Sequence, residues 1–200
     1  MTRDRDADAV WYACERVVAG RSAAGRDPDA DTYGKGPSAE RLEARTAGLL
    51  GKEAAVWMPS GTMAQQIALR IHADRSTTRA VAFHPQCHVE THEERGYAYL
   101  HDLVARLVGD RNRLIEPADL DDVREPVAAL LLELPQRDLG GRLPSWDELV
   151  ETCEKVRERG WALHLDGARL WQCEPFYSRS HEEIAALFDT VYVSFYKDLR

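Results

Sequence analysis

Short apolar runs alternate with helical segments through this chain of 200 residues. The run from Val127 to Glu133 is almost continuously apolar, which is typical of a strand covered on both faces of a parallel sheet. Two further apolar runs, over 161–165 and 190–195, each follow a helical segment. This alternation predicts right-handed βαβ units and an α/β fold, with a mostly parallel sheet covered by helices on both faces.

Two of the helices have strong start signals, since capping boxes begin at Ser145 and Ser180. We expect the first helix to run to Gly160 and the second to about Phe188. The earlier half of the chain continues the alternation less regularly. Its predicted strands are 54–58, 80–83 and 113–115. Its predicted helices are one capped by Ser38 and ended by Gly51, one over 61–71, a helical stretch that includes 102–108, and one that starts at Pro117.

The first thirty residues are weakly patterned, and one amphipathic helix is predicted there from Trp11, Tyr12, Cys14, Val17 and Val18. The chain therefore divides into a divergent N-terminal helical segment, 1–30, and a larger domain, 31–200.

Composition excludes several functional classes. A net charge of −8 without any Lys/Arg-rich run argues against a nucleic-acid partner. No apolar stretch reaches 18 residues, so a membrane span is not expected, and the charged start lacks the apolar segment of a secretion signal. The four cysteines are widely spaced and form no CxxC, which is typical of reduced thiols. We expect a cytoplasmic protein.

Candidate site residues follow predicted strands, where open α/β sheets bind their ligands. Ser60, Gly61 and Thr62 lie between a strand and a helix. Glycine lets the backbone approach an anion, threonine adds a hydroxyl, and the helix N-terminus offers free N–H groups to a phosphate. The simpler interpretation of Ser60 is a helix cap only.

Asp166, Arg169 and Lys197 follow the next two apolar strands. An amine, an acid and a guanidinium at neighbouring strand ends are the groups that a pyridoxal phosphate site needs. The amine binds the cofactor covalently, the acid keeps the pyridine nitrogen protonated, and the guanidinium takes the substrate carboxylate. Each residue also has an ordinary interpretation, as a surface Asp–Arg pair and a solvated lysine.

Several segments resemble the threonine aldolase branch of the aromatic amino acid β-eliminating lyase superfamily. These are pyridoxal 5′-phosphate enzymes with the large domain of the aspartate aminotransferase-like (fold type I) fold. The resemblance covers about residues 31–200 and rests on Tyr33-Gly34, Leu42-Glu43, Gly51-Lys52-Glu53-Ala54-Ala55, Pro59-Ser60-Gly61-Thr62-Met63-Ala64, Leu163-His164-Leu165-Asp166-Gly167-Ala168-Arg169-Leu170 and Ser194-Phe195-Tyr196-Lys197.

The resemblance assigns roles to individual residues. It implies that Lys197, His88 and Asp166 are catalytic, with Lys197 the cofactor-bound lysine and His88 stacked on the ring. Glu93 is a weaker match. The implied cofactor-binding residues are Ser60, Gly61, Thr62, His88, Asp166, Arg169 and Lys197, and the implied substrate-binding residues are Arg169 and Gln136.

Three departures from the family pattern stand out. The usual Ser-Asp-Thr segment is absent from residues 1–30. Where relatives carry Glu-Asn-Thr-His-Asn, this chain has Gln136 in place of the histidine, and an amide cannot act as a general base. After Lys197 the usual Gly-Leu-Gly is replaced by residues 198–200, and the small C-terminal domain does not follow. We therefore expect the chain to be the N-terminal part of a longer homodimeric or homotetrameric protein.

The activity implied by the resemblance is carbon–carbon cleavage of a β-hydroxy or β-substituted α-amino acid to glycine and an aldehyde. The alternatives are β-elimination from another amino acid, or a non-catalytic truncated relative. A third hypothesis is a metal site on a helix, since His84, His88 and His92 are spaced by four. Pro85 disfavours a helix there.

Overall fold

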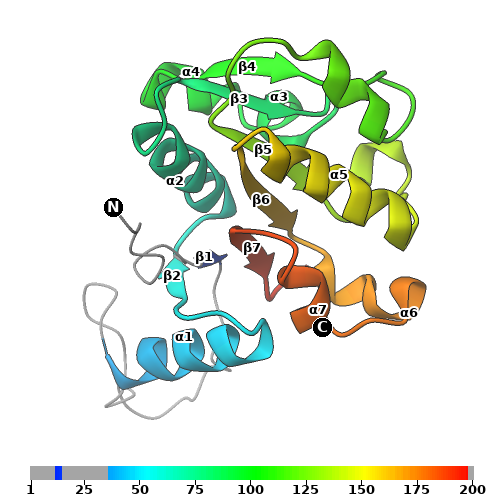
Figure 1. The fold of residues 1–200 in the computed structure, drawn as a ribbon. Helices are drawn as coiled ribbons and strands as arrows, with labels where there is room; N and C mark the ends of the chain where they lie inside the picture. The colour runs from blue at the N-terminus through cyan, green and yellow to red at the C-terminus, as the bar shows by residue number, and fades with distance from the viewer. Residues whose placement is uncertain (1–11, 15–35, 198–200) are drawn as a thin grey trace, which may run out of the picture.

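A seven-stranded sheet forms the centre of the computed structural model, which describes residues 12–14 and 36–197. All the strands are parallel, in the order β2-β1-β7-β6-β5-β3-β4. The strands are β1 (Tyr12–Cys14), β2 (Val56–Met58), β3 (Ala80–Phe83), β4 (Val104–Leu107), β5 (Ala129–Glu133), β6 (Ala162–Gly167) and β7 (Thr190–Ser194). The predicted parallel α/β architecture is confirmed (Figure 1).

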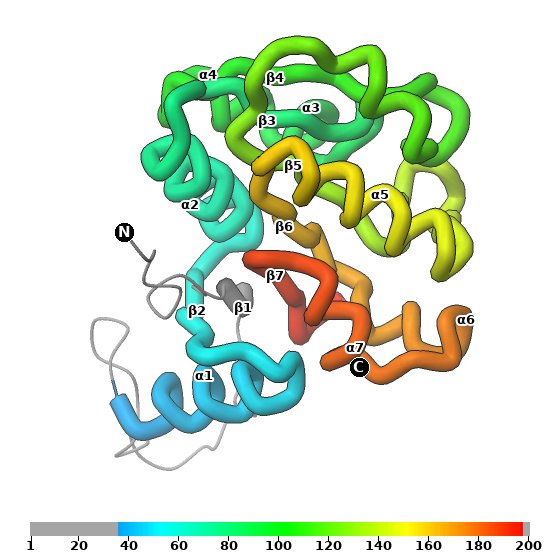
Figure 2. Tube along the Cα trace, viewed as in Figure 1, coloured from blue at the N-terminus to red at the C-terminus, as the bar shows by residue number. Residues whose placement is uncertain are grey.

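Helices cover the sheet on both sides. They are α1 (Pro37–Leu49), α2 (Gly61–Asp74), α3 (His88–Thr91), α4 (Gly96–His101), α5 (Trp146–Glu158), α6 (Glu174–Tyr177) and α7 (His181–Ala185), with 3-10 turns η1 (Pro117–Asp122), η2 (Arg137–Leu139) and η3 (Leu170–Gln172). The trace in Figure 2 shows α2 on one side of the sheet and α5 on the other. Within the described residues, no helix is long and apolar enough to cross a bilayer.

The apolar pattern of each element explains its burial. Every residue of β5, β6 or β7 except Ala162 is buried, because these strands have helices on both faces. On one face, Leu69 of α2 packs in a cluster with Val81 and Leu131. On the other, Leu149 of α5 packs in a cluster that includes Leu163. The sheet is thereby held between two apolar layers.

Several predicted elements are confirmed with shifted ends. Capping boxes at Ser145 and Ser180 begin α5 and α7, as predicted. However, α7 ends at Ala185 rather than near Phe188, because the chain turns there to enter β7. The helix assigned to a Ser38 cap starts two residues earlier than that cap implies, at Pro37, with Gly36 as its cap.

Three predicted elements are wrong. The segment 102–108 is not helical. α4 ends at His101, its C-cap Asp102 has a φ of +55°, and Val104–Leu107 becomes an edge strand beside β3. A helix is predicted there because the apolar residues 103, 104, 107 and 108 have the spacing of one helix face. No strand forms over 113–115 in the described chain, where the Arg113 carbonyl accepts a hydrogen bond from His84 instead of a neighbouring strand.

The helix predicted near the N-terminus is wrong for Tyr12–Cys14, which form β1 between β2 and β7. The backbone of these residues pairs with two neighbouring parallel strands instead. The rest of that predicted helix, and the division of the chain at residue 30, lie outside the described residues.

Candidate functional site

The strands all point the same way, so their carboxyl ends meet at one edge of the sheet. A cavity of about 100 Å³ opens there. Six of the eight predicted site residues line it, namely Ser60, Gly61, Thr62, His88, Asp166 and Lys197. The structure therefore brings together residues that are up to 137 positions apart in the sequence, from 60 to 197.

The first wall of the cavity is the N-terminus of α2. Ser60 caps this 14-residue helix, and its hydroxyl accepts a hydrogen bond from the Met63 N–H at 3.5 Å. Gly61 follows, and a Cβ placed on it would lie 2.7 Å from Cζ of Tyr192, so only glycine fits against that ring. Free backbone N–H groups and the positive end of the helix dipole thus face the cavity and favour an anion.

A buried carboxylate also lines the cavity. Asp166 lies near the end of β6, only 3% exposed, and its Oδ1 accepts a hydrogen bond from the Ala168 N–H at 3.0 Å. Burial raises the pKa of Asp166, while the positive charges of His88 and Lys197 oppose that rise. A cationic group in the cavity would stabilise the ionised form.

A second carboxylate orients the imidazole. The Nδ1 of His88 lies 3.0 Å from Oε1 of Glu93, whose other oxygen accepts a hydrogen bond from Nε2 of Gln66 at 3.0 Å. This hydrogen bond to Glu93 is the main cause that raises the pKa of His88, and burial opposes it. With Nδ1 held by Glu93, Nε2 is the ring nitrogen that can take up or release a proton.

Lys197 is placed by the segment that leaves β7. The indole N–H of Trp171 donates to the Ser194 carbonyl at 2.7 Å, and the Trp171 ring stacks on Phe195 with centroids 5.7 Å apart. These contacts hold the chain just before Lys197, which is half-buried at the cavity.

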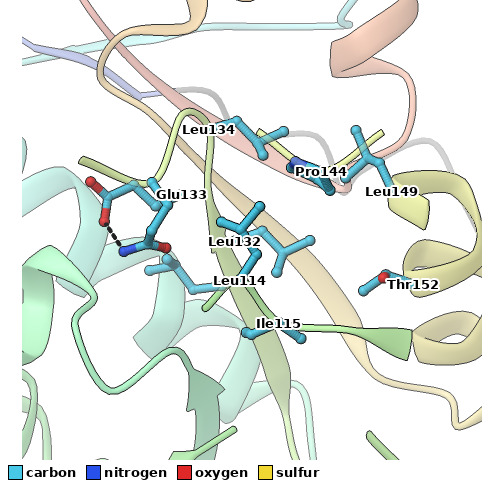
Figure 3. Close-up of a pocket in the computed structure, with 10 residues that line it drawn as sticks. Leu114, Ile115, Leu132, Glu133, Leu134, Pro144, Leu149 and Thr152 are labelled. Carbon is cyan, nitrogen blue, oxygen red and sulfur yellow. Dashed lines mark hydrogen bonds between the residues drawn. The ribbon is translucent and has the colours of Figure 1, made fainter. Parts of the chain in front are cut away.

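Two predicted residues do not line this cavity. Arg169 follows β6 and is half-buried, and within residues 36–197 its guanidinium makes no ion pair. Gln136 lines a separate cavity of about 30 Å³ between β5 and α5 (Figure 3). Its amide donates to Oε2 of Glu133 and to the Gln86 carbonyl, both at 3.1 Å.

The three histidines spaced by four do not converge on one point. His84 bonds to the carbonyls of Asp110 and Arg113, His88 to Glu93, and His92 to Asp138. Across the described part of the chain, no group of three or more His, Cys, Asp or Glu side chains is placed to hold a metal ion.

Sequence reasoning missed four residues that line or support the cavity: Gln65, Gln66, Tyr192 and Tyr196. One signal could have found the glutamines. They follow Gly61 by four and five positions on a helix whose neighbouring residues are apolar, so they fall on the buried face and need partners there. Tyr192 sits in an apolar strand, where its sequence pattern indicates only core.

The arrangement suits a ligand with two different ends. An anionic group fits the start of α2, and a protonated ring nitrogen fits the buried Asp166 carboxylate. Lys197 adds a nucleophilic amine, and His88 adds a proton carrier, in the same cavity.

Comparison with known proteins places these features in a family. Residues 8–200 match the family of beta-eliminating lyases. The aldolase vrtJ of Penicillium aethiopicum is 33% identical over 205 residues, which cover 98% of this chain and 51% of that protein. The chain spans about half the length of the curated relatives it matches.

Two solved structures are similar in both sequence and fold. A candidate L-allo-threonine aldolase of Listeria monocytogenes is 53% identical, with a TM-score of 0.83 over 86% of this chain and 48% of that one. A candidate aromatic amino acid beta-eliminating lyase/threonine aldolase of Exiguobacterium is 48% identical, with a TM-score of 0.84 over 88% of this chain and 50% of that one. These likenesses agree with the fold class predicted from the sequence.

Proposed function

The chain belongs to the beta-eliminating lyase family, and we propose that it forms the cofactor-binding part of a pyridoxal 5′-phosphate-dependent lyase. The proposed reaction is threonine aldolase-like cleavage of a β-hydroxy-α-amino acid to glycine and an aldehyde. One observation carries the proposal: the Lys197 amine and the buried Asp166 carboxylate line one cavity together with the start of α2.

The cavity residues fit the cofactor. When bound, pyridoxal 5′-phosphate supplies an electron sink for the bond cleaved at the substrate α-carbon. Ser60, Gly61 and Thr62 would hold its phosphate through the N–H groups of α2. Asp166 would hold the pyridine nitrogen protonated, and Lys197 would bind the aldehyde carbon through its amine.

His88 is the group proposed to move a proton. Its Nδ1 is held by Glu93, so Nε2 can accept a proton from a substrate group and return it. We also propose that the His88 ring stacks on the cofactor ring, because His88 resembles the stacking histidine of the family.

The proposed substrate contacts are Arg169 and Gln136. A guanidinium matches a carboxylate in a planar, two-point fashion, which suits Arg169 for the substrate carboxylate. Gln136 can donate and accept hydrogen bonds but cannot remove the β-hydroxyl proton. Its amide is moreover engaged by Glu133.

The direct test is an assay of the full-length protein with L-threonine and with L-allo-threonine, measuring acetaldehyde and glycine. We expect both products, with slow L-threonine turnover because Gln136 is not a base. Rapid threonine cleavage that is undiminished by Gln136→Ala would show that no base is needed at that position. Absence of cleavage with both diastereomers would count against an aldolase.

β-Elimination is the second candidate, and the missing base at Gln136 favours it, since this reaction expels the β-substituent without deprotonating a β-hydroxyl. Pyruvate and ammonia released from serine-type substrates would identify it. A protein that binds the cofactor and yields neither set of products would be a non-catalytic relative.

We further propose a cytoplasmic homodimer or homotetramer acting on a small amino acid. Within the described residues, the cysteines Cys87, Cys153 and Cys173 form no disulfide bond and are buried, as suits a reducing compartment. Light scattering of the full-length protein tests the oligomer, and a monomer at micromolar concentration would contradict it.

A further inference from the structure

Four buried polar side chains form a continuous chain of hydrogen bonds beneath the cavity. Oε1 of Gln65 lies 2.6 Å from Nε2 of His164, and Nδ1 of His164 lies 2.7 Å from Oγ1 of Thr190. The same threonine oxygen lies 2.8 Å from Nε2 of His72. These hydrogen bonds join α2 to the neighbouring strands β6 and β7 in the middle of the sheet.

Because these four side chains are buried, their polar atoms need hydrogen-bond partners within the protein. Gln65 is 1% exposed and His164 is fully buried, and Thr190 and His72 are nearly so. A polar group without a partner in such surroundings is costly, so each donor here must face an acceptor. Burial also lowers the pKa of His164 to about 3, so its ring is neutral and carries one N–H.

The chemistry of these atoms determines which group donates in each of the three hydrogen bonds. A carboxamide oxygen only accepts, so Nε2–H of His164 donates to Gln65, and Nδ1 of the neutral ring must accept. The Thr190 hydroxyl therefore donates to Nδ1, and its oxygen accepts from Nε2–H of His72. All three hydrogen bonds point consistently toward Gln65 Oε1.

This direction leaves the side-chain nitrogen of Gln65 to donate into the cavity. Gln65 lines the cavity, four residues after Gly61 and so on the same face of α2. Its oxygen is taken by His164, and within residues 36–197 its amide nitrogen has no hydrogen-bond partner. The nitrogen carries two N–H groups, which need an acceptor.

We infer that Gln65 is a ligand-binding residue that donates a hydrogen bond from Nε2 to an oxygen of the cofactor in the cavity. His164 is a positioning residue that prevents the carboxamide from turning over and presenting its oxygen instead. This inference rests on the proposed pyridoxal 5′-phosphate function and adds to it a residue outside the segment that holds the phosphate.

The test measures the dissociation constant of pyridoxal 5′-phosphate in the full-length protein by absorbance titration. Gln65→Glu keeps an oxygen for His164 but has no donor for the cavity. We expect its affinity to fall by about 10- to 100-fold, as for loss of a hydrogen bond to a charged group. Gln172→Glu, which makes the same change of charge at an exposed position, is the control and should bind as the unaltered protein does.

A double-mutant cycle tests the positioning role. His164→Phe should weaken cofactor binding when Gln65 is present and change nothing further in a Gln65→Leu background. If His164→Phe does not fold, Thr190→Val gives a milder disturbance of the same chain, with the same dependence on Gln65. Equal losses in both backgrounds would show that His164 acts on stability rather than through Gln65.

The outcomes separate the two proposals. If the unaltered protein binds no pyridoxal 5′-phosphate, the proposed function fails and this inference fails with it. If the unaltered protein binds the cofactor and Gln65→Glu binds it equally well, the function stands and the role of Gln65 is wrong.

Discussion

Glu133 and Asp166 occupy paired positions on the neighbouring parallel strands β5 and β6. Both side chains are buried, and the negative charge of Asp166 adds to burial in raising the pKa of Glu133, to about 7. The N–H of Arg137 and the charge of His88 oppose this rise. Two carboxyl groups therefore share one end of the sheet, one in the cavity with Lys197 and one beside it.

This pair predicts a pH-dependent stability. A carboxyl whose pKa is raised by folding contributes stability while it is protonated, and that contribution is lost as the pH rises from about 4.5 through about 7. The difference corresponds to ~3 kcal/mol. We expect Glu133→Gln to flatten the dependence of the unfolding free energy on pH across this range. Denaturant unfolding of the cofactor-free protein at several pH values measures it, and an unchanged slope would contradict the prediction.

Gly61 should tolerate no side chain. In Gly61→Ala the new Cβ meets the Tyr192 ring, and overpacking of this kind costs ~1–3 kcal/mol. Displacement of the start of α2 should also weaken cofactor binding. Gly48→Ala is the matched control, because nothing lies within 4 Å of that Cβ. We expect it to leave stability unchanged or slightly raised in thermal unfolding.

The steric clash expected in Gly61→Ala is with the side chain of Tyr192. Tyr192→Phe removes the hydroxyl nearest the added Cβ, so Gly61→Ala should cost less in that background than in the unaltered protein. Equal costs in both backgrounds would place the conflict elsewhere.

Glu93 should set the protonation of His88. Because the hydrogen bond to Glu93 is the main cause of the raised pKa of His88, Glu93→Gln should lower that pKa. A histidine NMR titration measures it directly. Glu94→Gln alters an exposed neighbour and should leave the His88 titration unchanged. A His88 pKa unaffected by Glu93→Gln would show that the ring is held by other groups.

Substitution of Lys197 and substitution of Asp166 should have different effects on cofactor binding and turnover. Lys197→Ala should abolish the visible absorbance band of the bound cofactor, because the covalent bond needs the amine. Asp166→Asn should keep some binding but lose most turnover, since a neutral amide holds the ring nitrogen protonated less well. Absorbance spectra and product assays of the full-length protein distinguish the two, and full activity of Asp166→Asn would remove Asp166 from its proposed role.

The sequence by itself determined the architecture and most of the candidate cavity. Continuous apolar runs such as 129–133 require burial on both faces, and capping boxes at Ser145 and Ser180 need only a few neighbouring residues to form. Once the strands are parallel, groups after Met58, Asp166 and Ser194 must meet at one edge. Local chemistry and periodicity were therefore sufficient to predict that Gly61 and Lys197 lie at the same edge of the sheet.

Tertiary structure decided what depends on neighbours distant in sequence. Val104–Leu107 became an edge strand because β3 offered backbone partners, which its helix-like spacing does not reveal. Gln136 donates to Glu133 and lines a separate cavity, whereas Gln65 lines the main cavity and accepts from His164, 99 residues away. Such hydrogen bonds form only when folding excludes water from both partners, so their direction follows from packing and not from the order of residues.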